Sequence, residues 1–200
     1  VLTFSDLQAD IAADLIRKGV QVHAFNQRDI EGIFGMIRTV GALTGCSARA
    51  AKLVDAYAMR VARVAAHTRP HRPRVWFEEW DEPLISGIRW VSELIEVAGG
   101  QDVFADLRHG PGARERIVTP EAAAAAMPEV ILASWCGKKV VPERIAGRPG
   151  WDRVPAVRDG RIHEIKSPLI LSPGPAALTA GLDALVEALW GGQAALGAVA

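Results

Sequence analysis

The sequence has 200 residues, the size of one ordinary domain or two small lobes, and half of them are hydrophobic, which suffices for a buried core. Its 23 basic and 23 acidic residues cancel, and this balance argues against binding of nucleic acid or of a membrane surface through net charge. No apolar stretch reaches the roughly 18 residues that a membrane-spanning helix needs.

The first part of the chain alternates between strand and helix patterns. Residues 2–4 have the pattern of a strand end, and a helix over 6–18 follows. Residues 20–25 alternate as a strand does, and a second helix is predicted from residue 29 to about residue 44. This order is typical of a parallel sheet. Because nothing precedes the first strand, we expect an N-terminal part to be absent from this chain.

Residues 47–69 predict one long helix. The segment contains no glycine or proline, and at 1.5 Å per residue it would be roughly 30 Å long. Such a helix is well suited to join two lobes. Its apolar stripe recurs at spacings of three and four and consists of Ala50, Val54, Tyr57, Val61 and Val64.

The β-α pattern then restarts, which predicts a second lobe. The fold class is therefore α/β, with two parallel-sheet lobes joined by one long interlobe helix and with an incomplete N lobe. The predicted domains are a remnant of the N-terminal lobe over 1–46, the interlobe helix and linker over 47–72, and a C-terminal α/β lobe over 73–200. The elements predicted in this lobe are a strand at 74–80, helices at 88–100 and 119–127, a buried strand at 129–134, a strand, turn and strand over 154–166, and a C-terminal helix from residue 173.

Parallel sheets place ligands at the carboxyl ends of their strands. Polar and aromatic residues follow five predicted strands, and we expect them to line a cleft between the lobes. The candidate ligand-binding residues are Phe4, Phe25, Asn26, Trp80, Asp81, Glu82, Trp135, Cys136, Lys138, Lys166 and Ser167.

Aromatic and acidic residues concentrate between residues 72 and 100, although the whole chain is only 6% aromatic. Alternation predicts that Trp76 and Phe77 belong to the core, whereas Trp80 at the strand end forms one wall of the cleft. Glu78 and Glu79 lie inside the strand, so each must be solvated or paired. The candidate partners are Arg89 and Lys166.

The sequence predicts neither a metal site nor a catalytic one. Cys46 and Cys136 lack the spacing of a metal or redox motif, and Cys136 is expected to be buried and inert, although Lys138 and Lys139 beside it would favour a thiolate. His163 is expected on the surface or at the cleft. Nucleotide-binding, hydrolase and zinc-protease motifs are missing, so we predict a binding protein and not an enzyme.

Several separate blocks resemble one family, over essentially the whole chain. The blocks "EEWDEPLISGIRW", "SWCGKK" and "HEIKSPLILSPGPAAL" resemble the C lobe of cobalamin-binding proteins of ABC importers. These belong to the helical-backbone class of periplasmic substrate-binding proteins, also called class III, which bind metal chelates. The long helix resembles their interlobe helix, and the resemblance implies that roughly the first quarter of a full-length protein is missing.

The resemblance implies a ligand, partners and a location. The ligand would be cobalamin or a related corrinoid, with no catalytic cofactor. The partners would be the membrane subunits of an ABC transporter, and Glu121 matches the C-lobe residue that docks on them. We expect a monomer that binds no nucleic acid and is periplasmic, or extracellular and membrane-anchored. The chain shows no signal peptide, so a cytoplasmic location stays open.

Two alternatives remain. The ligand could be another metal chelate, a siderophore or haem. Haem favours a tyrosine or histidine axial ligand, but the single tyrosine, Tyr57, falls in the long helix, and this disfavours haem. The protein could also be an intracellular corrinoid-handling protein or enzyme on the same fold. The residues that would then act are Glu78, Glu79, Cys136, Lys138 and Lys139.

Overall fold

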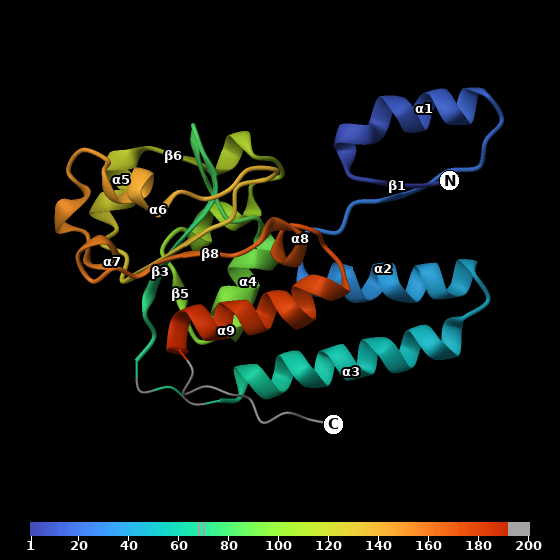
Figure 1. Ribbon diagram of the computed structural model, residues 1–200. Coiled ribbons are helices and arrows are strands. Elements are labelled where there is room, and N and C mark those ends of the chain that lie inside the picture. The colour runs from blue at the N-terminus through green and yellow to red at the C-terminus, as the bar shows by residue number, and fades with distance from the viewer. Residues whose placement is uncertain (68, 70, 192–200) are drawn as a thin grey trace.

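The computed structural model describes residues 1–67, 69 and 71–191 and contains two β-sheets (Figure 1). A small parallel sheet joins β1 (Leu2–Phe4) to β2 (His23–Phe25). A larger sheet has the order β6-β4-β3-β7-β8, with β5 paired to one end of β3. Its strands are β3 (Arg74–Asp81), β4 (Leu84–Ser86), β5 (Gln101–Asp102), β6 (Ile117–Val118), β7 (Val130–Ala133) and β8 (Ile162–Glu164).

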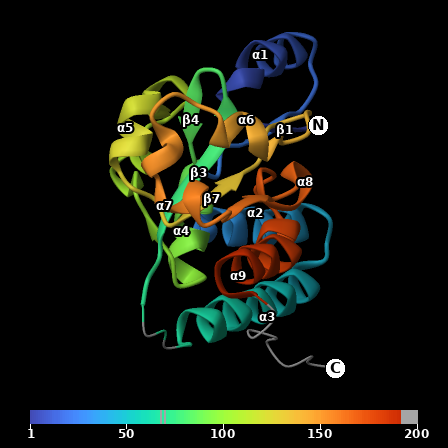
Figure 2. The same cartoon turned by 60° about the vertical axis from the view of Figure 1, so that its left-hand side comes forward.

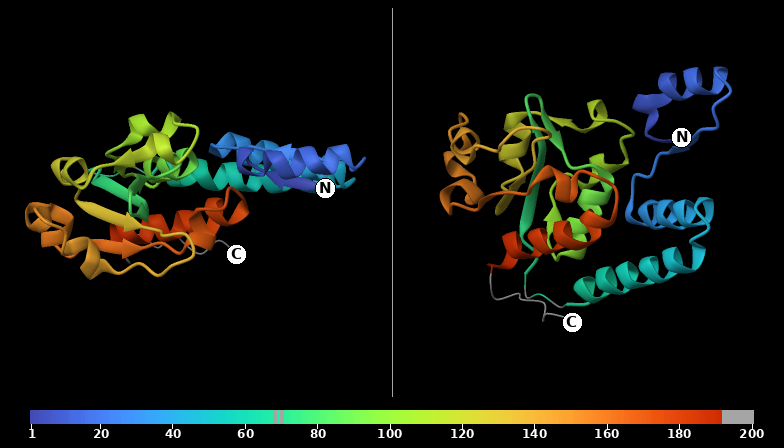
Figure 3. Two further views of the ribbon diagram at one scale, coloured as in Figure 1. Left: turned by 90° about the horizontal axis from the view of Figure 1, so that it is seen from above. Right: turned by 45° about the vertical axis from the view of Figure 1, so that its right-hand side comes forward.

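The small sheet carries one helix whose apolar side is uncovered. Helix α1 (Ala9–Arg17) follows a 3-10 turn, η1 (Asp6–Gln8), and buries none of its residues. Leu7 is 90% exposed, and Ile11 and Ile16 are also exposed. Seen from above (Figure 3), α1, α2 and α3 extend to the same side, away from the large sheet.

Two long helices connect the small sheet to the large one. Helix α2 (Ile30–Leu43) is preceded by its N-cap Asp29, whose carboxylate accepts the Gly32 N–H, and helix α3 (Ser47–Ala65) runs back alongside it. A Cβ on Gly41 would lie 2.3 Å from Ala50 Cβ, so glycine is required at this crossing. Helix α3 is the predicted long helix, ending at Ala65 rather than near residue 69. It also packs on α4 (Arg89–Val97), so the lobes are joined by a packed helical layer.

The large sheet is covered on both faces, as the unbroken apolar pattern of β7 predicts. Val75 and Phe77 face α4, the π-helical segment η5 (Ala177–Gly181) and α9 (Leu182–Trp190). Figure 2 shows α3 and α9 next to each other below this face. Trp76 faces the opposite layer, which contains α5 (Pro120–Ala125), α6 (Pro142–Ala146) and α7 (Pro155–Arg158). Trp76 and Phe77 are fully buried, so their assignment to the core is confirmed.

Two parts of the sheet differ from the predicted elements. Residues 154–159 were expected to form a strand, but they contain α7, because Pro155 occupies its first turn and residues 157–159 continue the helical hydrogen bonds. Strand β4 was not predicted. It forms an antiparallel hairpin with β3 around residues 82–83, and its three residues are too few to show periodicity.

The remaining elements are short. No helix in the described ranges has both the length and the hydropathy to cross a membrane. The short elements are η2 (Ala105–His109), η3 (Arg114–Arg116), η4 (Trp151–Arg153) and α8 (Ser167–Ile170).

Candidate ligand-binding site

The carboxyl ends of β3, β7 and β8 meet at one edge of the large sheet because these three strands are parallel. The loops that follow β7 and β8 border a partly open cavity of about 330 Å³, here called the lysine cavity. Four of the predicted site residues line it: Trp135, Lys138, Lys166 and Ser167. Gly137, Lys139, Glu164, Ile165 and Pro168 complete its wall.

Trp80 and Trp135 lie on the same side of the molecule, because both contact the ammonium group of Lys138. That group is 4.1 Å from the Trp80 ring centroid and 5.4 Å from that of Trp135. Lys138 also pairs with the buried carboxylate of Asp81. The other Asp81 oxygen, Oδ2, is 3.4 Å from Arg144, whose guanidinium lies 5.6 Å from the Trp135 ring. The two indoles therefore adjoin a small cluster of charges.

Trp80 and Trp135 differ in accessibility. Trp80 is half-buried, and its Nε1–H donates to the Glu82 carbonyl at 2.9 Å. Trp135 is only 2% exposed, and its Nε1–H donates to Glu78 at 3.0 Å. Trp135 thus lines the lysine cavity, whereas Trp80 lies outside its lining, beside Lys138, with part of its ring exposed.

Glu78 is fully buried behind Trp135, and its partner is Arg148. The guanidinium donates to both carboxylate oxygens at 2.6 and 2.8 Å, and the Trp76 indole adds a bond of 3.1 Å. The expectation that Arg89 or Lys166 would pair with Glu78 is therefore wrong. Arg148 lies on the loop after α6, and packing of that layer on the sheet brings it to β3, which local spacing does not reveal.

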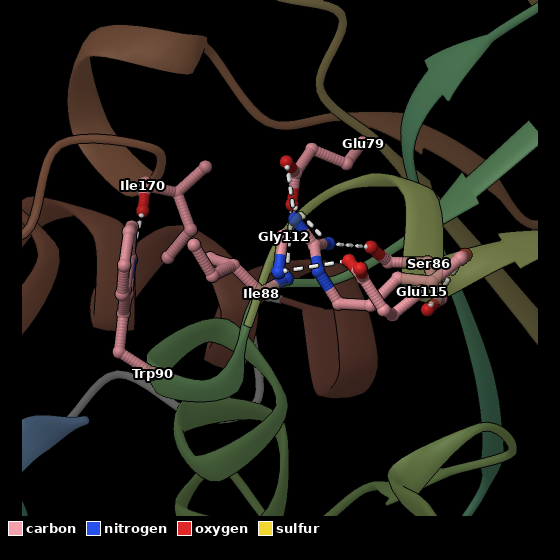
Figure 4. Close-up of polar contacts among 8 residues, drawn as sticks. Glu79, Ser86, Ile88, Trp90, Gly112, Glu115 and Ile170 are labelled. Atoms are coloured by element: carbon pink, nitrogen blue, oxygen red, sulfur yellow. Dashed lines mark hydrogen bonds and ion pairs between the residues drawn. The ribbon is translucent and has the colours of Figure 1, made fainter. Parts of the chain in front are cut away.

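Glu79, on the other face of β3, pairs with Arg116 at 2.8 and 3.0 Å (Figure 4). Arg116 also donates to the Ser86 carbonyl, and the Ile88 N–H donates to Glu79 at 2.9 Å. These bonds fix the segment that leads into α4. Arg89 instead binds Asp29 and Glu93, and Lys166 binds Glu164, so neither predicted partner reaches Glu79.

Phe4 and Phe25 line a second cavity of about 460 Å³, here called the phenylalanine cavity. It lies between the small sheet, α2 and residues 172–174, and Met36 and Val40 contribute apolar surface. Gln27 joins its two sides by donating to the Pro173 carbonyl at 3.1 Å. The segment 166–174 therefore borders both cavities.

Five predicted ligand-binding residues lie outside both cavity linings: Asn26, Glu82 and Cys136, which are exposed, Trp80, which is half-buried, and Asp81, which is buried. The expectation of a buried Cys136 is wrong, because the turn at Gly137 carries the thiol to the surface, where it is free. Glu121 is exposed on the first turn of α5, which Thr119 caps through the Ala122 N–H. His163 is half-buried between β8 and α9, in a different cavity.

The lysine cavity has excess positive charge. The hydrogen bond from Lys166, together with the charges of Lys166 and Lys139, holds the pKa of Glu164 below its usual range. Within the described ranges no three histidine, cysteine, aspartate or glutamate side chains gather as a metal site would require. The site therefore offers indole faces, ammonium groups and apolar surface as contacts for a ligand.

The arrangement of two sheets, a packed helical layer and a site at the strand ends defines the two-lobed α/β class of solute-binding proteins. A family model described as periplasmic binding protein matches residues 1–169. The chain therefore belongs to the periplasmic binding protein family. A comparison with curated proteins gave no match.

Solved structures share this fold at low sequence identity. A possible iron-binding protein from Staphylococcus epidermidis has a TM-score of 0.78 and 21% identity over 94% of this chain and 75% of its own. An ABC transporter substrate-binding protein from Listeria monocytogenes has a TM-score of 0.80 and 18% identity, over 95% of this chain and 76% of its own. A periplasmic heme-binding protein from Roseiflexus has a TM-score of 0.72 and 24% identity, over 90% of this chain and 72% of its own.

Proposed function

We propose that this chain is the substrate-binding component of an ABC importer and that it binds cobalamin or a related corrinoid between the phenylalanine and lysine cavities. The observation that carries this proposal is that one segment, 166–174, borders both cavities. A broad ligand lying across this segment would contact apolar surface at one end and ammonium groups at the other. Both volumes fall within the size range of ligand sites, roughly 300–1,000 Å³.

The chemistry of the lining suits a corrinoid. Such a ligand is flat, partly apolar and edged with amide arms, and its cobalt is already held by the macrocycle. Phe4 and Phe25 offer aromatic faces within the phenylalanine cavity, and Trp80 offers a partly exposed ring beside the lysine cavity. Gln8 and Gln27 offer amide groups that pair with amide arms. Such contacts bind the faces and the edge of a chelate and do not require a protein side chain to coordinate its metal.

A different metal chelate is the second candidate. The similar structures include periplasmic heme-binding proteins and an Fe3+-hydroxamate transport protein from Saccharomonospora viridis. The ammonium groups of the lysine cavity would suit acidic arms on such a ligand. Haem would need an axial ligand, and Tyr57 packs against the core on α3, outside both cavity linings.

The partners and location follow from the same proposal. The protein would deliver its ligand to the membrane subunits of the importer, with Glu121 on the exposed start of α5 as one docking residue. It would act as a monomer in the periplasm or, membrane-anchored, outside the cell. Glu121→Gln should then lower the rate of ligand uptake through the importer while leaving the affinity of the protein for its ligand unchanged.

Isothermal titration calorimetry tests the ligand class. The protein is titrated separately with hydroxocobalamin, haem and a ferric hydroxamate under identical conditions. We expect the corrinoid to bind at least tenfold more tightly than the other two, a difference of about 1.4 kcal/mol. Tighter binding of haem or of the hydroxamate would mean that this chelate, and not a corrinoid, is the ligand.

A further inference from the structure

The lysine cavity holds more positive charge than its own carboxylates neutralise. Lys138 and Arg144 share Asp81, and Lys166 pairs with Glu164. Lys139 also lines the cavity and makes no ion pair with any residue that the structure describes. The cavity lining therefore holds three lysines and one carboxylate, Glu164, and Asp81 beside it is shared by Lys138 and Arg144. A ligand with one or two negative charges would bring this group of charges closer to neutrality.

The loops that carry these charges are held in a fixed relation. Gly137 has a φ of +75°, a conformation that favours glycine. Lys138 and Lys139 follow this turn directly, and both line the cavity. The Val140 N–H lies 3.4 Å from Glu164 Oε1, so the loop after β7 is tied to the end of β8. The lysines thus surround a formed cavity, which distinguishes them from scattered surface charges.

The cavity is too small for a whole macrocycle. Its volume of about 330 Å³ lies at the lower end of the range for ligand sites, which suits one peripheral group of a larger molecule. The hydrogen bond from Lys166 and the charges of Lys166 and Lys139 lower the pKa of Glu164, as expected where cations outnumber carboxylates.

We infer that the lysine cavity is an oxyanion subsite, in which Lys139, supported by Lys138 and Lys166, binds a phosphate or carboxylate group at the edge of the ligand. This inference rests on the proposed function and adds a specificity rule. A chelate with an acidic arm is selected over the same chelate without it, because only the former neutralises the cavity. The Ser167 hydroxyl on the cavity wall offers an additional hydrogen bond to the oxyanion.

The test compares Lys139→Gln with Lys52→Gln, which removes the same charge from an exposed position on α3. Each variant is titrated with cobalamin, whose nucleotide loop carries a phosphate, and with cobinamide, a corrinoid that lacks this loop. We expect Lys139→Gln to weaken cobalamin binding about fivefold and to leave cobinamide binding unchanged. Lys52→Gln should change neither, and added salt should weaken cobalamin binding to the wild type more than to Lys139→Gln.

The other outcomes separate the subsite from the proposed function. If the wild type binds both corrinoids and Lys139→Gln weakens both equally, or changes the affinity for neither corrinoid nor haem, the subsite is wrong and the corrinoid proposal stands. If Lys139→Gln weakens haem but not cobalamin, the bound oxyanion is a carboxylate.

If the wild type binds neither corrinoid nor haem, a titration with inorganic phosphate, followed by amide NMR, decides. Saturable shifts at residues 136–139 and 166–168 that vanish in Lys139→Gln would support the subsite without a corrinoid. Their absence would overturn it.

Discussion

Glu78 and Arg148 form a two-bond ion pair at 2.6 and 2.8 Å, although 70 positions separate them in the sequence. The pair lies directly behind Trp135, whose indole N–H also binds Glu78. The Arg148 guanidinium in turn lies 4.7 Å from the Trp151 ring. The pair therefore links β3 to the layer of α5, α6 and α7, which packs on one face of the large sheet. Its role is to hold one wall of the candidate site in place.

Arg148→Met should destabilise the fold strongly. It would leave the fully buried Glu78 carboxylate with two indole donors and no opposite charge, and loss of one partner of a buried pair costs about 3–5 kcal/mol. Urea unfolding measures this change. Arg158→Met, at an exposed arginine, serves as the control and should shift the free energy of unfolding by less than about 0.5 kcal/mol. Equal stability of the two variants would mean that the pair does not support the fold.

Trp80→Ala should lower corrinoid affinity by more than tenfold, about 1.4 kcal/mol, because the partly open ring supplies an aromatic face at the strand end. Trp80→Phe keeps a flat ring and should retain most of the affinity. Titration calorimetry with cobalamin measures both. A wild-type dissociation constant in Trp80→Ala would remove Trp80 from the site.

The stability of the fold should decrease as the pH falls below about 6.5, the ordinary pKa of histidine. Burial, with the nearby charge of Arg161, lowers the pKa of His163 in the folded state. The unfolded chain therefore takes up a proton at a higher pH than the folded chain does, and this favours unfolding in the window below 6.5. The other charged side chains that line the cavity around His163 are Arg161, Glu164 and Glu187.

Thermal unfolding of wild type and His163→Gln between pH 7.5 and 5, at constant ionic strength, isolates this contribution. The melting temperature of the wild type should fall more steeply with acidification than that of the variant. Parallel curves would show that His163 does not contribute.

The lobes should move little when a ligand binds. Arg89, at the start of α4, pairs with Asp29 at 3.1 Å and with Glu93 at 2.9 Å, and Glu93 accepts the Ile30 N–H at the start of α2. These bonds tie α2 to α4, which packs on the large sheet, so we expect backbone shifts of about 1 Å or less. Small-angle scattering profiles with and without cobalamin should coincide for the wild type. Arg89→Met should increase the difference, and a large change already in the wild type would argue against a rigid connection.

Strong periodicity made much of the fold predictable. The alternation in β3 separated Trp76 from Phe77, and the glycine-free run over residues 47–69 predicted most of α3. Helix α7 was missed because Val154 and Val157 are β-branched and read as strand, whereas the proline between them begins a helical turn. Short elements such as β4 depend on tertiary pairing, which a local pattern does not contain.

The candidate site was predictable only where it lies at strand ends. Trp80 and Asp81 end β3, and Lys138 and Lys166 follow β7 and β8, as the parallel-sheet rule suggested. Arg144 and Arg148 belong to α6 and the loop after it, and no spacing in the sequence relates them to Asp81 or Glu78. Their roles depend on how the outer helical layer packs on the sheet.

Retention of a corrinoid through desalting tests the central claim most directly. The protein is incubated with cobalamin, separated from free ligand on a desalting column, and its absorbance spectrum is recorded beside that of a sample incubated with haem. We expect a corrinoid spectrum that elutes with the protein and decreases in Trp80→Ala. A protein fraction that carries haem but no corrinoid, or neither, would contradict it.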